Sequence, residues 1–125
     1  MENYLIEDFN KALNNLQEVL KMEKTGIIRD AAIKRFELCF DLAWKTIKEY
    51  AKNEGIECKT PRECIKQAFQ MNLLDYNEDW LEMVLKRNES VHLYDDESAE
   101  KLYTFLDRYA IMFQELFNKI KHSVA

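Results

Sequence analysis

The stretch IRDAAIKRFELCFDLAWKTIKEYAKNE (residues 28–54) decides the fold class. Its apolar residues recur at spacings of three and four, which is the period of an α-helix, and Gly55 follows as a typical stop signal. We therefore predict one long helix over residues 28–54. The residues expected on its core face are Ala32, Phe36, Cys39, Phe40, Ala43, Ile47, Tyr50 and Ala51.

Three further apolar residues of this stretch, Leu38, Leu42 and Trp44, lie off the centre of that face. A helix that is apolar on several sides is normally buried on several sides. In a chain of 125 residues the neighbouring helices cannot easily cover all of them. Closed two-fold pairing is the commonest way to cover such a surface, so we expect a homodimer or a higher even oligomer.

Helical periodicity and capping signals continue on both sides of this stretch. Thr25-Gly26 is expected to end the first helix, with glycine as its left-handed cap. Thr60-Pro61-Arg62-Glu63 has the pattern of a capping box. The predicted helices cover residues 4–24, 28–54, 60–71, 77 to just before 94, and 95 or 96 to 121.

Glycine and proline are scarce in this chain, with Gly26, Gly55 and Pro61 as the complete set. Sheet proteins need turn residues often, whereas long helices need few. Short connections make neighbouring helices antiparallel. We predict an all-α fold, an up-down-up-down antiparallel four-helix bundle with an additional short helix, in one domain over residues 1–125.

The formal charge of −5 argues against a general nucleic-acid binder, because phosphate contacts require a basic surface. RNA would have to bind through a local patch. No apolar run approaches the ~18 residues that a membrane span needs. The polar, acidic start of the chain does not resemble a signal peptide. These features lead us to expect a cytoplasmic protein that does not enter membranes.

The chemistry of cofactors and metals finds little support in the sequence. Two isolated glycines cannot form a glycine-rich phosphate loop. The cysteines Cys39, Cys58 and Cys64 are odd in number and lack a Cys-x-x-Cys pair. We expect reduced thiols, no disulfide framework, no metal site and no cofactor.

The segment from Arg87 to Tyr94 is the strongest candidate for a functional site. It places Arg87, Asn88, His92 and Tyr94 within eight positions near the end of a helix. On a continuous helix Arg87 and His92 would stand about 140° apart, so they converge only if the helix ends between them. Arginine suits phosphate, and histidine exchanges protons near neutral pH. This pair would serve either phosphate binding or metal-independent RNA cleavage.

A purely structural interpretation of the same residues also stands. Arg87 would then pair with Glu82, Glu89 or an acid of the next helix. His92 would be an ordinary helix-end residue. Ion pairs and terminal histidines are common enough to keep this interpretation open.

The motif Arg87-x4-His92-x-Tyr94 resembles the Arg-x4-His-x-Tyr motif of the HEPN superfamily. More specifically, the chain resembles the nucleotidyltransferase substrate-binding protein family. The supporting stretches are Arg35-Phe36-Glu37, Phe40 to Lys45, Thr60 to Glu63, and Trp80 to Asp95, in a resemblance that covers roughly residues 4 to 120.

The resemblance implies a homodimeric helical bundle that works with a small nucleotidyltransferase encoded nearby. The chain would be the substrate-binding subunit, holding a phosphate-bearing substrate near Arg87 and His92. The alternative that the resemblance implies is a metal-independent endoribonuclease toxin with Arg87 and His92 as catalytic residues. The transferase would then neutralise it by adenylyl transfer to Tyr94, the implied modification site.

Overall fold

The computed structural model describes residues 3–92 and 95–124, and the secondary structure of these residues is entirely α-helical. The helices are α1 (Asn3–Leu20), α2 (Gly26–Asn53), α3 (Pro61–Gln70), α4 (Glu78–Ser90) and α5 (Asp96–Val124). The predicted all-α class is therefore confirmed for this part of the chain. None of the helices described has the length and apolar character needed to cross a membrane.

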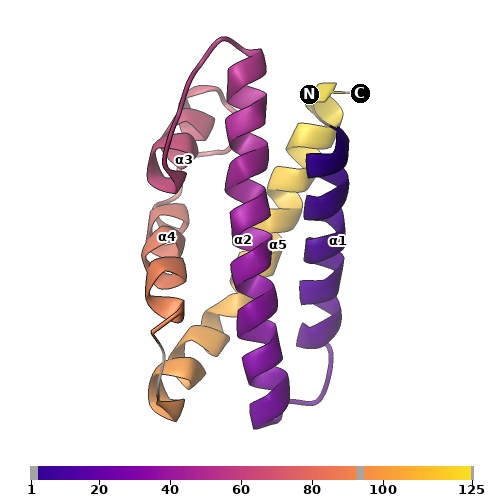
Figure 1. The fold of residues 1–125 in the computed structure, drawn as a ribbon, viewed down its shortest axis with the longest axis vertical. Helices are drawn as coiled ribbons and strands as arrows, with labels where there is room; N and C mark the ends of the chain where they lie inside the picture. The colour runs from indigo at the N-terminus through magenta and orange to yellow at the C-terminus, as the bar shows by residue number, and fades with distance from the viewer. Residues whose placement is uncertain (1–2, 93–94, 125) are drawn as a thin grey trace.

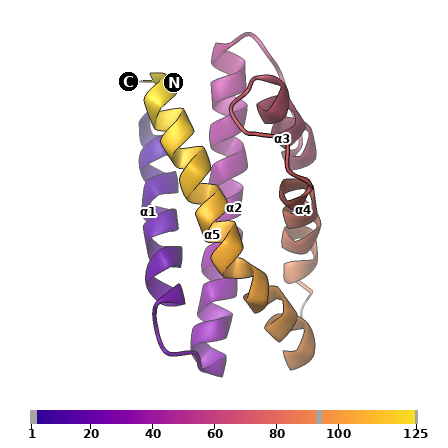
Figure 2. The ribbon, with the colours of Figure 1, turned by 180° about the vertical axis from the view of Figure 1, so that it is seen from behind.

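The three long helices, α1, α2 and α5, pack on one another, and α3 and α4 follow each other along the other side of α2 (Figure 1). Helices α1 and α2 run in opposite directions. Helix α5 starts below α4 and crosses obliquely to end beside the start of α1, as the view from behind shows (Figure 2). As a result, α2 touches every other helix and is the centre of the fold.

Aromatic rings connect the helices in the core. Phe36 of α2 lies with its ring centroid 5.6 Å from that of Tyr109 and 6.3 Å from that of Phe113. Phe113 also contacts Phe9 of α1 at 6.3 Å and Trp80 of α4 at 5.9 Å. Each fully buried large apolar side chain contributes roughly 1.5–3 kcal/mol to stability. This cluster therefore holds four helices together through one set of contacts.

The predicted core face of α2 is confirmed, with only Tyr50 of that set partly exposed. The three residues predicted off the centre of this face are more exposed than the face itself. Leu42 and Trp44 are half-buried, and Leu38 is 55% exposed. Trp44 thus packs against the edge of the core, which agrees with its predicted place off the centre of the core face.

The role expected for Gly26 was wrong. Helix α1 ends at Leu20, and Gly26 is the first residue of α2 instead of the cap of α1. Thr25 caps α2, with its hydroxyl accepting a hydrogen bond from the Ile28 amide at 3.1 Å. A threonine side chain at this position satisfies a backbone donor that would otherwise be unpaired, so Thr25-Gly26 starts a helix.

The capping signals predicted for the later helices are confirmed. The Thr60 hydroxyl accepts from the Glu63 amide at 3.2 Å, and Glu63 accepts in turn from the Lys59 amide at 3.1 Å. Asn77 caps α4 by accepting from the Asp79 amide. At the start of α5, Asp95 accepts from the Ser98 amide at 2.7 Å.

The expectation of three reduced thiols was also wrong, because Cys58 and Cys64 form a disulfide. Cys58 lies in the connection between α2 and α3, and Cys64 lies in the first turns of α3. The start of α3 folds back on this connection and brings the two cysteines together. Cys39 remains a free thiol in the core, where burial raises its pKa.

A buried arginine that the sequence did not single out joins the starts of α2 and α5. Arg29 donates to Asp30, to Asp96 at 3.0 Å and to Glu100 at 3.2 Å. Lys24 also pairs with Glu100. The acidic residues in the first turns of α5 thus have a structural role, because they form ion pairs with Arg29 of the neighbouring helix α2.

Candidate functional site

Arg87 lies in the last turns of α4 and binds Asp41 in the middle of α2. Its Nε atom is 3.1 Å from Asp41 Oδ1, and its Nη2 atom is 3.0 Å from Asp41 Oδ2. This two-point geometry is the strong form of an arginine–carboxylate pair. The Arg87 side chain is 21% exposed and that of Asp41 is 36% exposed, so solvent and ligands can reach the pair.

The charge on Arg87 is reinforced by its surroundings. The hydrogen bond with Asp41 is the main cause of a raised Arg87 pKa, and the negative charges of Asp41 and Glu37 add to it. Desolvation acts in the opposite direction and is the smaller effect. Arg87 is therefore a permanent cation whose guanidinium plane is held in one orientation.

A second contact fixes the end of α4 to α2 one turn before Asp41. Glu37 is only 7% exposed, and its Oε2 atom lies 2.5 Å from the Ser90 hydroxyl oxygen. The same hydroxyl lies 2.7 Å from the carbonyl oxygen of Arg87. Lys34 Nζ is 3.5 Å from the other carboxylate oxygen of Glu37. Two acids four residues apart on α2 thus position the residues around Arg87.

A shallow hollow of about 300 Å³ lies beside the Glu37–Ser90 contact. It lies between the end of α4 and the starts of α2 and α5. Because its volume is small, it can admit a small chemical group but not a large ligand. The residues that line it are Asp30, Ile33, Lys34, Glu37, Ser90, Val91 and Ala99.

Helix α4 ends at Ser90, which lies between Arg87 and His92. The structural condition for their convergence, a helix end between them, is met. His92 is exposed in the turn that follows, and its amide donates to the Glu89 carbonyl at 2.9 Å. Asn88 is also exposed. Tyr94, the predicted modification site, lies outside the described residues.

The acid that pairs with Arg87 was not among the expected ones. The expected partners were Glu82, Glu89 or an acid of the next helix, whereas the partner is Asp41 of the preceding long helix. Asp41 is a polar residue within an apolar stretch of α2, and that position was the available signal. Its partner is 46 residues away, beyond the reach of helical spacing.

The arrangement has a defined chemical capacity. An arginine held by a carboxylate presents planar donors that match a phosphate equally well. A phosphate that approaches Arg87 must compete with Asp41 or share the guanidinium with it. Among the described residues there is no cluster of three or more potential metal ligands.

The fold and this site define a small all-helical protein with a two-point arginine–carboxylate pair at the junction of its central helix with α4. Over residues 4–122 the sequence matches the family described as "nucleotidyltransferase substrate binding protein like". The chain belongs to this family, which confirms its resemblance to the nucleotidyltransferase substrate-binding proteins.

Solved structures share this fold. A protein of Thermus thermophilus is 33% identical, with 90% of this chain and 98% of that chain covered and a TM-score of 0.84. HI0074 of Haemophilus influenzae, described as having the fold of a substrate-binding domain of a nucleotidyltransferase, is 19% identical, with 93% and 98% covered and a TM-score of 0.79. A toxin–antitoxin crystal structure with AMP-PNP is 15% identical, with 94% and 95% covered and a TM-score of 0.74. No protein with a curated description matches the chain.

Proposed function

We propose that this protein is the substrate-binding subunit of a two-component nucleotidyltransferase and pairs with a small transferase encoded nearby. The observation that carries the proposal is the family match over residues 4–122, nearly the whole chain. The similarity to HI0074, described as a substrate-binding domain of a nucleotidyltransferase, supports it at the level of the fold. In this proposal the acceptor substrate carries a phosphate and binds near Arg87 and His92.

The Arg87–Asp41 pair suits such a role because it orients the Arg87 guanidinium before the substrate binds. Asp41 holds the guanidinium in one orientation, which lowers the entropic cost of binding. A substrate phosphate takes over part of the hydrogen bonding now made by Asp41. Asn88 and His92, both exposed, supply further polar contacts at the end of α4.

Pairing with other chains is the second part of the proposal. Leu38 of α2, Leu85 of α4 and Val91 after α4 are each more than half exposed. We propose that these apolar side chains are buried at the interface of a homodimer or a higher even oligomer. The transferase then binds to this oligomer. Within this assembly the chain is an up-down-up-down four-helix bundle with α3 as its additional short helix, and the assembly works in the cytoplasm.

The test is co-expression of this chain with the neighbouring transferase, followed by co-purification and measurement of the nucleotidyl product. We expect a stable complex whose activity falls at least tenfold with Arg87→Ala. Arg108→Ala is the matched control, because Arg108 is an exposed arginine on α5 that pairs with Asp79 at 3.5 Å. Equal activity of the two variants, or no complex with the transferase, would overturn the proposal.

A metal-independent ribonuclease is the second candidate, favoured by the helix end between Arg87 and the exposed His92. His92 would activate a ribose 2′-hydroxyl or protonate the leaving oxygen, and Arg87 would stabilise the charge at phosphorus. The relative solved as a toxin–antitoxin with AMP-PNP shares the fold. In this case the transferase neutralises the chain by modifying Tyr94.

Expression of the chain alone separates the two candidates. If the chain is a ribonuclease, it should be toxic when expressed alone and should cleave RNA in the presence of EDTA. His92→Ala should abolish both the toxicity and the cleavage. Incubation with active transferase and nucleotide then raises the intact mass by one or more nucleotidyl groups, and Tyr94→Phe prevents the increase. Absence of toxicity and cleavage would retire this candidate and leave the substrate-binding role.

A further inference from the structure

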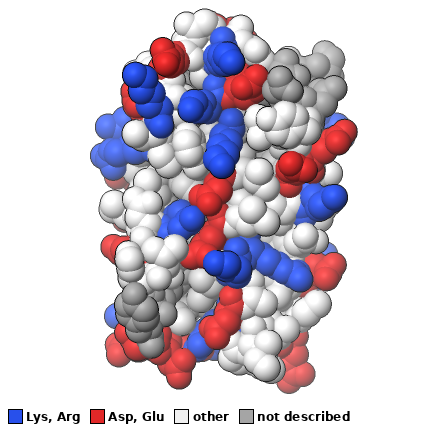
Figure 3. Space-filling view, in the orientation of Figure 1, with Lys and Arg blue, Asp and Glu red and all other residues white. Residues whose placement is uncertain are grey.

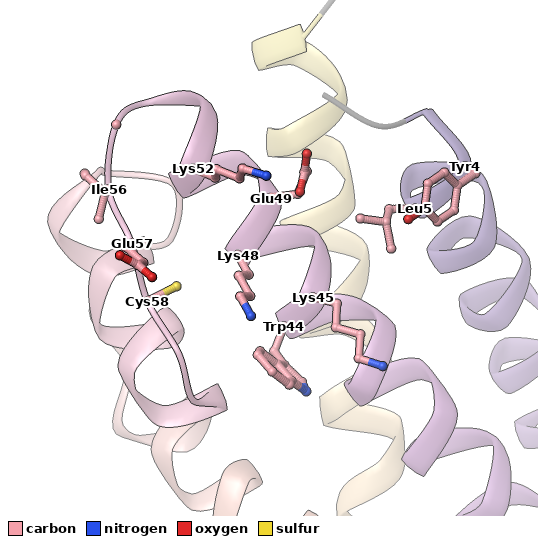
Figure 4. Close-up of a pocket in the computed structure, with 11 residues that line it drawn as sticks. Tyr4, Leu5, Trp44, Lys45, Lys48, Glu49, Lys52, Ile56, Glu57 and Cys58 are labelled. Carbon is pink, nitrogen blue, oxygen red and sulfur yellow. The ribbon is translucent and has the colours of Figure 1, made fainter.

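A hollow lies away from Arg87, on the outer side of the second half of α2. It has a volume of about 760 Å³, which is within the usual range for small-molecule sites. The start of α1 forms one wall, and the connection between α2 and α3 forms the other (Figure 4). Its lining residues are Tyr4, Leu5, Trp44, Lys45, Lys48, Glu49, Lys52, Gly55, Ile56, Glu57 and Cys58.

Three lysines, Lys45, Lys48 and Lys52, line this hollow at spacings of three and four residues. This spacing places them on one side of α2. All three are exposed, and within residues 3–92 and 95–124 none of them forms an ion pair. Two acids, Glu49 and Glu57, also line the hollow. Basic groups therefore outnumber acidic ones here, in a chain with a formal charge of −5.

The surface around the hollow shows the same bias. On the face that α2 presents in Figure 3, basic side chains gather over the upper half, towards the end of α2, and acidic side chains predominate along the lower edge. A local concentration of positive charge on an acidic protein attracts an anionic ligand to that place.

Trp44 adds a flat aromatic surface to these charges. It is half-buried, so one part of the indole packs on the protein while another part faces the hollow. Lys48 lies on the same side of α2, with its Nζ atom 5.9 Å from the centroid of the Trp44 ring (Figure 4). Aromatic side chains beside lysines are the usual combination for stacking a base while binding its phosphates.

The wall opposite α1 is a fixed one. Gly55, with a φ of +79°, turns the chain sharply after α2. Cys58 then joins the wall to α3 through the disulfide with Cys64. A wall held in this way keeps the hollow open before a ligand arrives, which reduces the cost of binding.

We propose that this hollow binds a nucleoside polyphosphate, with the base against Trp44 and the phosphates among Lys45, Lys48 and Lys52. The size of the hollow, its excess of lysines and its half-exposed indole each match one part of such a ligand. The site goes beyond the function proposed above, because it requires neither Arg87 nor the transferase.

Tryptophan fluorescence of the isolated full-length chain tests the site, with ATP as the probe. The protein has two tryptophans, and Trp80 is only 3% exposed in the core. We expect saturable quenching by ATP at micromolar to millimolar concentrations, and loss of the quenching in Trp44→Phe. Calorimetry should still detect binding to Trp44→Phe, because phenylalanine also stacks on a base. If neither fluorescence nor calorimetry of the natural chain shows saturable binding of ATP, the proposal is overturned.

A matched pair of triple variants tests the lysines. Replacing Lys45, Lys48 and Lys52 by glutamine should weaken ATP binding at least tenfold. The control replaces Lys11, Lys21 and Lys119 by glutamine, three exposed lysines outside the hollow, and changes the net charge equally. Circular dichroism melts confirm that both variants fold. Equal weakening in the two triple variants would mean general charge attraction and would overturn the site.

Two simpler probes test the chemical class of the ligand. Tripolyphosphate should bind several-fold more weakly than ATP, because it cannot stack on Trp44. Adenosine should bind at least tenfold more weakly, because it lacks the phosphates. Tripolyphosphate binding as tightly as ATP would show a plain anion site and overturn the proposal. None of these measurements contains the transferase, so failure here leaves the substrate-binding role to be judged by its own test.

Discussion

The guanidinium of Arg87 binds both carboxylate oxygens of Asp41, at 3.1 Å and 3.0 Å, across the junction of α4 with the central helix. The pair joins the strongest candidate for a phosphate-binding residue to an acid that competes with phosphate. It therefore contributes to stability and tunes the availability of the cation at the same time.

Removal of Asp41 should separate these two effects. Because the pair is partly exposed, we expect a coupling of about 0.5–1 kcal/mol between Asp41→Ala and Arg87→Ala in a double-mutant cycle of unfolding. Asp41→Asn should also strengthen phosphate binding at Arg87, because the amide oxygen can still orient the guanidinium while the competing negative charge is gone. Weaker phosphate binding by Asp41→Asn would contradict this account.

Ser90 should matter more for stability than its small size suggests. Ser90→Ala removes a hydrogen-bonding partner from the buried carboxylate of Glu37, and an under-satisfied buried polar group costs about 1–3 kcal/mol. Chemical denaturation measures the loss. Ser123→Ala, which removes an exposed hydroxyl near the end of α5, should change stability by less than about 0.5 kcal/mol.

The start of α5 should loosen in acid. Hydrogen bonds from Ser98 hold the Asp95 pKa below its ordinary value, and Lys24 and Arg29 lower that of Glu100. A carboxyl group whose pKa is lower in the folded state stabilises the protein above its unfolded pKa, roughly 4. That stability is lost as pH falls through the folded pKa.

The pH dependence can be measured from the melting temperature between roughly pH 6 and 3. Asp95→Asn should flatten the decline below about pH 4, because asparagine caps a helix without titrating. A variant with the same acid slope as the natural chain would show that Asp95 does not contribute to acid sensitivity.

The three cysteines should differ sharply in reactivity. In the native oxidised protein a thiol reagent should label none of them, because Cys39 is buried with a raised pKa and the other two form the disulfide. Cys58 and Cys64 are themselves 1% and 0% exposed, so unfolding without reductant should expose Cys39 alone, and unfolding after reduction should expose all three thiols. Reduction should cost about 2 kcal/mol of stability, as expected for a short closed loop. Two reactive thiols without reductant would contradict the disulfide.

The exposed side of α2 should be needed for self-association. Leu38→Glu places a charge at an apolar position that is 55% exposed in the single chain, and we expect it to shift the oligomer towards monomer in light scattering. Ile27→Glu, at a more exposed apolar position in the first turn of α2, is the control and should leave the oligomer intact. A well-folded natural monomer at micromolar concentration would remove the basis for this prediction.

The amino-acid sequence by itself determined which segments are helical and where most of them begin. The buried face of α2, the caps formed by Thr60, Asn77 and Asp95, and the end of α4 before Tyr94 all follow from patterns a few residues long. Helical periodicity and capping act between residues three or four apart, so these features can be recognised along the chain. The error at Thr25-Gly26 arose within the same range, because a threonine cap and a glycine stop compete as interpretations of two adjacent residues.

Only the tertiary structure decided the partners of the charged residues and of the cysteines. Asp41 meets Arg87, Glu37 meets Ser90, and Arg29 meets Asp96 across separations of 46, 53 and 67 residues. It also decided that Trp44 and three lysines line one hollow, because the α1 wall and the α2–α3 connection complete it. Such contacts depend on how whole helices are placed against one another, and helical period carries no information on which distant side chain that placement brings near.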